Sequence, residues 1–235
     1  MNLAEFRQSS VPICQSAKRF NKVFGIGANK TGTSTLQAIF QIIGLNVAPQ
    51  QQGETLGLDL YRGNFIAFSD YVRQYDAFQD APFSVKTTYA QVDALFPGSK
   101  FILTHREPEI WFNSLLNFHK KLFRCDAAAE SPSREEVKRD TYILPGYLAF
   151  MAEVNWLLDV DPNLGSRIDW DLGYQKDHYI SLYVQRNQAI VRHFSERPRD
   201  LLVIDITREV GTHRIIEFLE LPDMLVTSVP HVNKT

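Results

Sequence analysis

Short apolar runs alternate with amphipathic stretches along most of this chain. The apolar runs predict strands at residues 22–26, 45–47, 83–86, 101–104 and 201–205. Apolar positions at helical spacing predict helices at residues 33–43, 65–74, 89–95, 109–123, 176–194 and 212–219. The stretch between the second strand and the second helix, residues 49–64, is expected to be irregular. Strands that alternate with helices favour an α/β fold with three layers, in which a mostly parallel sheet is flanked by helices.

Residues 124–175 interrupt this alternation. They begin with a run rich in Ala, Ser, Pro and Glu and continue into a stretch dense in aromatic side chains, among them Tyr147 and Trp156. We expect a single domain over residues 1–235, with 124–175 as a helical insertion over the carboxyl edge of the sheet. Two interpretations of the insertion are equally supported, a lid that binds an acceptor molecule and ordinary helical packing.

The composition is that of a soluble enzyme domain. Of the 235 residues, 44% are hydrophobic and 22% are charged, which suffices for one full α/β core. The formal net charge of -2 gives no basic surplus for nucleic acid or anionic lipid. The two cysteines form neither a disulfide framework nor a metal-binding spacing. No apolar run reaches the roughly 18 residues of a transmembrane helix. We therefore expect a cytoplasmic protein with no transmembrane segment and no nucleic-acid partner.

The candidate chemistry begins where the predicted strand 22–26 ends. A glycine-bearing turn follows, and the next helix is predicted to begin at Thr33. In this layout, backbone N–H groups and the helix N-terminus face an anion. The spacing from Gly27 to Gly32 fits the nucleotide phosphate loop, but Thr33 stands where that motif requires lysine. The lysine lies inside the loop, at Lys30. The loop therefore suits a 5′-phosphate with one further transferable group better than a triphosphate.

The segment from Lys30 to Leu36, KTGTSTL, resembles the 5′-phosphosulfate loop of sulfotransferases that use 3′-phosphoadenylyl sulfate (PAPS). The resemblance implies a P-loop-like sulfotransferase fold of the bacterial type. It implies PAPS as the donor, adenosine 3′,5′-bisphosphate as the product, and no metal. It also implies that the cofactor is bound by Asn29, Lys30, Thr31, Gly32, Thr33, Ser34 and Thr35.

A second motif lies further along the chain. The predicted strand 101–104 leads to Arg106, and Ser114 follows eight residues later within the next predicted helix. The planar fork of arginine grips phosphate oxygens in bidentate fashion. PAPS sulfotransferases hold the 3′-phosphate of adenosine with an arginine and a serine at this spacing. The resemblance therefore implies that role for Arg106 and Ser114, and it extends over about residues 22 to 235.

Sulfuryl transfer requires neutralisation of charge on the leaving oxygen and removal of a proton from the acceptor. We expect Lys30 to act on the leaving-group side. Lys86 lies in a segment that resembles two versions of the family. Cytosolic sulfotransferases place a histidine base two residues after this lysine, where the chain has Thr88. Heparan-type enzymes follow the lysine with an aromatic residue, as Tyr89 does here, and use a carboxylate base. Lys86 is expected to hold the sulfuryl oxygens or the acceptor, as the second catalytic lysine.

The general base remains open among several residues. Asp80, in an Asp-x-Pro element that resembles bacterial-type relatives, is the preferred catalytic candidate, with a turn-forming role as the alternative. Glu54 and Asp59 lie where heparan-type enzymes place their glutamate, and His105 directly precedes Arg106. No His, Cys or carboxylate cluster has metal-ligand spacing.

The sequence thus predicts a PAPS-dependent sulfotransferase of the EC 2.8.2 type. It would act on a hydroxyl or amine of a small molecule, sugar or lipid. One alternative is a divergent P-loop nucleotide or small-molecule kinase, in which Asp205 would hold Mg²⁺. Another is a family member that binds the cofactor without turnover. The sequence identifies neither the acceptor nor the oligomeric state.

Overall fold

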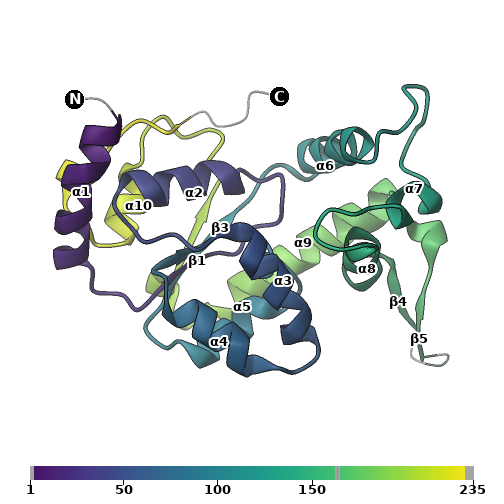
Figure 1. Ribbon diagram of the computed structural model, residues 1–235, viewed down its shortest axis with the longest axis horizontal. Helices are drawn as coiled ribbons and strands as arrows, with labels where there is room; N and C mark the ends of the chain where they lie inside the picture. The colour runs from purple at the N-terminus through teal and green to yellow at the C-terminus, as the bar shows by residue number, and fades with distance from the viewer. Residues whose placement is uncertain (1–2, 162, 164, 231–235) are drawn as a thin grey trace. The chain divides into compact units, whose positions relative to one another are not determined.

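The computed structural model describes residues 3–161, 163 and 165–230 (Figure 1). The chain divides into two compact units. We call the first, Met1–Arg106 with Ala189–Thr235, the sheet unit, and the second, Glu107–Gln188, the helical unit. The expected insertion 124–175 falls within the helical unit, and its role as a lid stays a prediction.

A four-stranded parallel sheet organises the sheet unit, with the strand order β2-β1-β3-β6. The strands are β1 (Val23–Gly25), β2 (Ala77–Phe78), β3 (Lys100–Thr104) and β6 (Leu201–Ile204). Successive side chains of β1 point to opposite faces, so Val23 and Phe24 enter two different apolar clusters. Both faces of the sheet are therefore covered, as parallel sheets require.

Helices form the two outer layers of the sheet unit. The cluster around Val23 includes residues of α1 (Leu3–Ala17), α2 (Thr33–Ile42) and α10 (His213–Phe218). The cluster around Phe24 includes residues of α3 (Gln50–Tyr61), α4 (Phe65–Arg73) and α5 (Thr88–Leu95). Two short 3-10 turns, Pro198–Asp200 and Asp223–Leu225, complete the unit. The predicted three-layer α/β fold is confirmed.

The predicted helices agree with the structure to within a few residues. The helices concerned are α2, α4, α5, α6 (Pro108–Leu122), α9 (Lys176–His193) and α10. Gly44 follows α2 with a φ of 93°, a left-handed conformation that suits glycine just after a helix end. Periodicity over whole turns thus located these helices well.

Three predictions between residues 45 and 86 were wrong. Residues 83–86 are not a strand but a series of turns, and the strand of this region is β2, at Ala77–Phe78. Phe83 and Val85 are buried and alternate with polar residues as in a strand, although both lie in this series of turns. The expected strand 45–47 is reduced to an isolated parallel bridge between Val47 and Ala77. With only two residues, β2 is too short to give a periodic signal.

The third error is the stretch 49–64, which was expected to be irregular and contains α3. Its two glycines suggested a loop because glycine is unfavourable inside helices. In the structure they allow close packing. A Cβ on Gly53 would lie 2.9 Å from the Tyr71 hydroxyl, and one on Gly57 would lie 2.9 Å from Cβ of Pro82. These tertiary contacts explain why two glycines occur inside a helix, which helix propensity alone did not predict.

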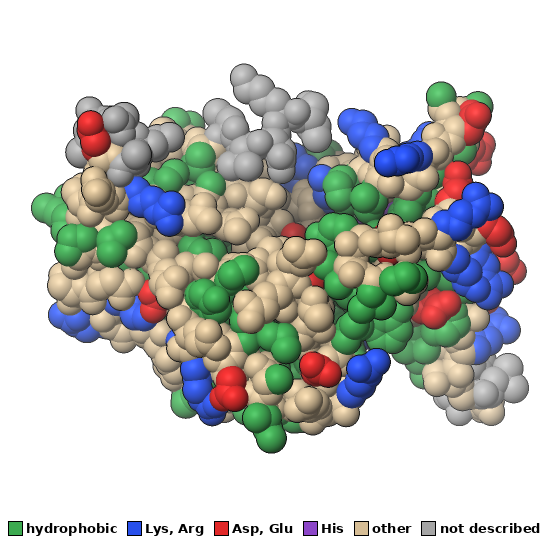
Figure 2. All heavy atoms as spheres, in the orientation of Figure 1, with side chains coloured by type: hydrophobic (Ala, Val, Ile, Leu, Met, Phe, Trp, Pro, Cys, Tyr) green, Lys and Arg blue, Asp and Glu red, His purple; other side chains and the backbone are tan. Residues whose placement is uncertain are grey.

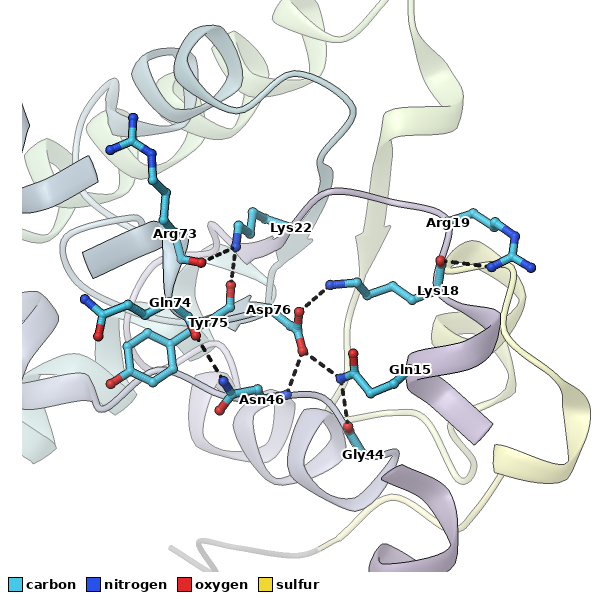
Figure 3. Close-up of polar contacts among 10 residues, drawn as sticks. All are labelled: Gln15, Lys18, Arg19, Lys22, Gly44, Asn46, Arg73, Gln74, Tyr75 and Asp76. Carbon is cyan, nitrogen blue, oxygen red and sulfur yellow. Dashed lines mark hydrogen bonds and ion pairs between the residues drawn. The ribbon is translucent and has the colours of Figure 1, made fainter. Parts of the chain in front are cut away.

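A polar cluster fastens α1 to the amino end of the sheet (Figure 3). The Asp76 carboxylate, just before β2, accepts hydrogen bonds from Lys18, from the Gln15 amide at 2.8 Å and from the Asn46 N–H at 3.1 Å. The Lys22 ammonium, just before β1, donates to the carbonyl of Tyr75 at 2.6 Å. These bonds compensate the burial of the charged groups of Asp76 and Lys22.

The helical unit combines helices with a hairpin. Its elements are α6, α7 (Arg134–Lys138), α8 (Tyr147–Ala152), a π turn (Glu153–Leu157), β4 (Leu158–Asp161), β5 (Gly165–Ile168), a 3-10 turn (Trp170–Leu172) and most of α9. β4 and β5 pair antiparallel, which the sequence analysis did not expect. Within the described residues, no helix combines the length and apolar character needed to cross a membrane.

Candidate functional site

Residues 26–32 form a tight loop at the carboxyl end of β1, between the strand and α2. Two glycines permit its path. A Cβ on Gly27 would overlap Thr104 at the end of β3, and one on Gly32 would overlap Ile206. Gly32 also has a φ of 98°, which an L side chain rarely adopts. The loop is therefore held against the neighbouring strand ends.

The hydroxyl of Thr31 fixes the interior of this loop. It lies 2.7 Å from the hydroxyl of Thr104 and also donates to the Ala28 carbonyl. Both threonine side chains are fully buried. Lys30 precedes this anchor with a φ of 67°, which is uncommon for a residue other than glycine. Because its backbone is held in this conformation, the position of Lys30 depends on the folded loop.

The N-terminus of α2 has the features that favour an anion. The helix begins at Thr33, and the N–H groups of its first turn have no partner within the helix. No acidic residue lies in that turn, and the N-cap Gly32 has no capping side chain. The positive end of the helix dipole and the N–H groups of Thr33, Ser34 and Thr35 are therefore available for an anion.

Arg106 connects the second motif to this loop. It follows β3, and its guanidinium donates a hydrogen bond to the carbonyl of Lys30 at 3.2 Å. β1 and β3 are adjacent, while the chain passes from β1 to β2 on the other side before it returns to β3. Ligands of α/β proteins bind at such a reversal, beyond the carboxyl ends of the strands. Lys30 and Arg106, which are distant in sequence, therefore meet in the sheet unit.

Ser114 lies on α6, in the helical unit, whereas Arg106 ends the first segment of the sheet unit. Its predicted pairing with Arg106 on one phosphate therefore stays a prediction.

Asp80 faces the first turn of α2. Its carboxylate accepts from the Thr33 hydroxyl at 2.7 Å, from the Ala81 N–H at 2.9 Å and from the Ser84 hydroxyl at 3.3 Å. Burial raises the pKa of Asp80. The three hydrogen bonds and the positive charge of Lys30 oppose that shift without cancelling it. The structure thus places the Asp80 carboxylate in contact with Thr33, at the start of α2, and near enough to Lys30 for its positive charge to act on the carboxylate.

Lys86 lies in a turn before α5. The prediction that it ends a strand was wrong. Its φ is 43°, and its side chain is half-buried. Burial lowers the pKa of Lys86 below the ordinary lysine value, because desolvation disfavours the ammonium form. The catalytic assignment of Lys86 remains a prediction.

The other candidate bases have different surroundings. Glu54, on α3, is buried and accepts from the Gln50 amide at 3.1 Å. Asp59 is half-buried on the same helix, and its carbonyl receives the N–H groups of Arg62 and Asn64 at the helix end. His105 is half-buried, and its backbone N–H donates to the carbonyl of Ile204 in β6.

A set of glutamines beside Asp80 was not found from the sequence. The Gln79 amide nitrogen lies 2.9 Å from the amide oxygen of Gln50 and 3.3 Å from that of Gln37. The Gln50 amide nitrogen donates to the Ala81 carbonyl at 2.9 Å and also to Glu54. Gln37 lies on α2, Gln50 lies on α3 and Gln79 follows β2, and no local pattern marks them. Only the fold places them together.

The described residues contain no group of three or more His, Cys, Asp or Glu side chains that could hold a metal ion. Asp205, the candidate Mg²⁺ ligand of a kinase, follows β6. Its carboxylate accepts from the Thr207 hydroxyl at 2.6 Å and pairs with Arg208 at 3.3 Å.

Comparison with known proteins identifies the family of the chain. A family model described as a sulfotransferase domain matches residues 22–235. A search among curated proteins gives no match. The matched range agrees with the extent of the resemblance expected from the two motifs. Because the match covers nearly the whole chain, the chain belongs to the sulfotransferase family, and the general activity is that of a transferase of the EC 2.8.2 type.

Proposed function

We propose that this protein transfers a sulfuryl group from PAPS to a hydroxyl or amine of a small-molecule, sugar or lipid acceptor. One observation supports the donor above all, the hydrogen bond from the Arg106 guanidinium to the Lys30 carbonyl at 3.2 Å. It joins the loop proposed for the 5′-phosphate to the arginine proposed for the 3′-phosphate. A donor with two phosphates on one ribose would use both.

The loop residues have three different parts in this proposal. Thr33, Ser34 and Thr35 offer first-turn N–H groups to the 5′-phosphate. Asn29 and Gly32 are the further loop residues assigned to the cofactor, and Gly32 allows close packing because a Cβ there would overlap Ile206. Thr31 shapes the loop, since its hydroxyl bonds to Ala28 and Thr104. These features fit a 5′-phosphate group.

Arg106 and Ser114 would hold the 3′-phosphate. Arginine is suited to this task because its fork can donate two parallel hydrogen bonds to phosphate oxygens. The Ser114 hydroxyl would add one hydrogen bond from α6. A donor without the 3′-phosphate is therefore expected to bind more weakly.

The chemistry follows from the charges beside the loop. The donor supplies a sulfur–oxygen bond that breaks at the phosphate while a new bond forms from sulfur to the acceptor oxygen or nitrogen. Lys30 stabilises the negative charge that develops on the leaving phosphate oxygen. Lys86 holds the sulfuryl oxygens or the acceptor. The displaced acceptor proton passes to the Asp80 carboxylate, whose raised pKa makes it a stronger base than an ordinary aspartate.

Calorimetry tests the donor assignment. Adenosine 3′,5′-bisphosphate, ADP and ATP are titrated into the protein, each with and without Mg²⁺. We expect preferential binding of the 3′,5′-bisphosphate that does not depend on Mg²⁺. Preference for ATP with Mg²⁺ would instead support a kinase. Turnover is then sought with PAPS and a panel of hydroxyl and amine acceptors, with the sulfated product detected by mass.

A further inference from the structure

The segment Gln79–Ala81 has a backbone that needs external support. Asp80 has a φ of 59°, in the left-handed region that non-glycine residues seldom occupy. Such a conformation is unfavourable for a residue with a Cβ and persists when the surrounding structure determines it. The position of the Asp80 carboxylate depends on this backbone.

Gln50 bonds to the residues on both sides of Asp80. From the first turn of α3, its amide nitrogen donates to the Ala81 carbonyl at 2.9 Å. Its amide oxygen accepts from the Gln79 amide nitrogen at 2.9 Å. One side chain therefore holds both neighbours of Asp80 in a single geometry.

The orientation of the Gln50 amide is fixed by its partners. A backbone carbonyl can only accept, so the group facing Ala81 must be the nitrogen. The same nitrogen donates to Glu54 one turn along α3, at 3.1 Å. The amide oxygen must then face Gln79. The two ends of Gln50 are thus not interchangeable.

The opposite side of Asp80 faces the phosphate loop. Its carboxylate accepts from the Thr33 hydroxyl, and the positive charge of Lys30 acts on it. A shift of the segment would move the carboxylate away from Thr33 and toward water. The hydrogen bonds of Gln50 and those of Asp80 therefore act on one segment from two directions.

We propose that Gln50 is a positioning residue for Asp80, and that it holds the Asp80 carboxylate against the N-terminus of α2. This inference concerns the reaction only as far as the proposed function assigns Asp80 a part in it. Gln50 itself touches no reacting atom.

The test compares Gln50→Met with Gln51→Met. Methionine keeps the length of the side chain and removes the amide, and Gln51 is an exposed neighbour on the same helix. The pKa of Asp80 is followed by ¹³C NMR of labelled aspartate carboxyl groups, without donor or acceptor. Its signal is identified by its absence from Asp80→Asn. Circular dichroism verifies that each variant is folded, and Gln79→Met, which removes one arm of the contact, serves as a second variant.

In the wild type and in Gln51→Met we expect Asp80 to titrate above the ordinary aspartate value of about 3.9. In Gln50→Met the pKa should fall toward that value, and kcat with PAPS should fall roughly tenfold, while Gln79→Met shifts both in the same direction by less. An Asp80 titration and a kcat that match those of Gln51→Met would overturn the inference. A shifted titration with unchanged kcat would leave the positioning intact and reject the catalytic role of Asp80.

Discussion

The sheet unit and the helical unit are stabilised by different means. Strands β1 and β3 of the sheet unit are buried on both faces. Because the two strands are parallel, the residues that follow them lie at the same edge of the sheet. In the helical unit, stacked rings connect the helices, as in Trp111 on Tyr183 with 4.1 Å between ring centroids. Strand β5 of its hairpin is exposed along its whole length. Backbone pairing positions residues in the first unit, and side-chain stacking does so in the second.

This difference has a functional consequence. All the proposed phosphate-binding residues except Ser114 belong to the sheet unit, where a short motif determines a loop of fixed shape. The helical unit contains the aromatic-rich stretch and no such motif. The donor is therefore the better supported half of the proposed reaction, and the acceptor is the half that experiments must identify.

The largest expected effect is on the stability of the helical unit. Trp111 is fully buried, and Trp111→Ala should lower the free energy of unfolding by about 3–5 kcal/mol. All three tryptophans of the chain, Trp111, Trp156 and Trp170, belong to this unit. Urea unfolding followed by tryptophan fluorescence therefore reports on it alone. Trp170→Phe, at a half-buried position, is the control, and a loss in Trp111→Ala no larger than in this control would contradict the stacking account.

The next effect tests the sheet unit. Lys30→Ala should lower kcat by roughly 10²–10³-fold, because a charge that stabilises the leaving oxygen is lost. Affinity for adenosine 3′,5′-bisphosphate should change much less. Lys176→Ala removes a lysine of the helical unit that pairs with Glu109 at 3.1 Å, and it should leave kcat unchanged. Steady-state kinetics with PAPS decide the matter, and equal losses in both variants would remove Lys30 from the mechanism.

A smaller effect concerns the cofactor. Arg106→Ala should weaken binding of adenosine 3′,5′-bisphosphate by roughly 10–100-fold, as expected for the loss of hydrogen bonds to a charged group. Binding of adenosine 5′-phosphate, which has no 3′-phosphate, should be nearly the same in wild type and variant. Calorimetry with both ligands makes the comparison. If the two affinities fall together, the guanidinium acts by shaping the loop through Lys30 and not by holding the 3′-phosphate.

Ser114 offers the matching test for the helical unit. Ser114→Ala should weaken binding of the 3′,5′-bisphosphate by a smaller factor, about tenfold, since one neutral donor is removed. An unchanged affinity would confine the donor site to the sheet unit.

The smallest effect is at the amino end of the sheet. Burial alone would raise the pKa of Asp76, but hydrogen bonds from Lys18, Gln15 and the Asn46 N–H outweigh it and lower the pKa. The stabilisation from this carboxylate is therefore present above its unfolded pKa of about 3.9 and is lost as the pH falls through the lower folded value. Asp76→Asn should destabilise the protein by about 1–2 kcal/mol at pH 7, and the difference should shrink with acidification. Unfolding curves at several pH values measure it, and a difference independent of pH would contradict the assignment.

Much of the fold was predictable where the sequence repeats a signal. Helices such as α2 and α6 present several apolar turns, and the phosphate loop joins a buried strand to a helix through glycines that the structure requires. α3 was missed because Gly53 and Gly57 meet Tyr71 and Pro82, partners far from them in sequence. β2 was missed because a strand of two residues is too short to show the alternation of apolar and polar side chains. The hairpin β4–β5 was missed because each of its strands has only four residues, and all four residues of β5 are exposed.

By itself, the sequence determined the alternation of strands and helices, the glycine-bearing loop between β1 and α2 with Lys30 inside it, and the family. These depend on residues close together in the chain, whose local geometry is set by glycine, helix periodicity and strand burial. Only the tertiary structure brought Arg106 to the Lys30 carbonyl, turned Asp80 toward Thr33 and placed Gln50 between Gln79 and Ala81. Such contacts join residues from separate elements, and hydrogen bonds between them form only when the sheet and its helices have packed.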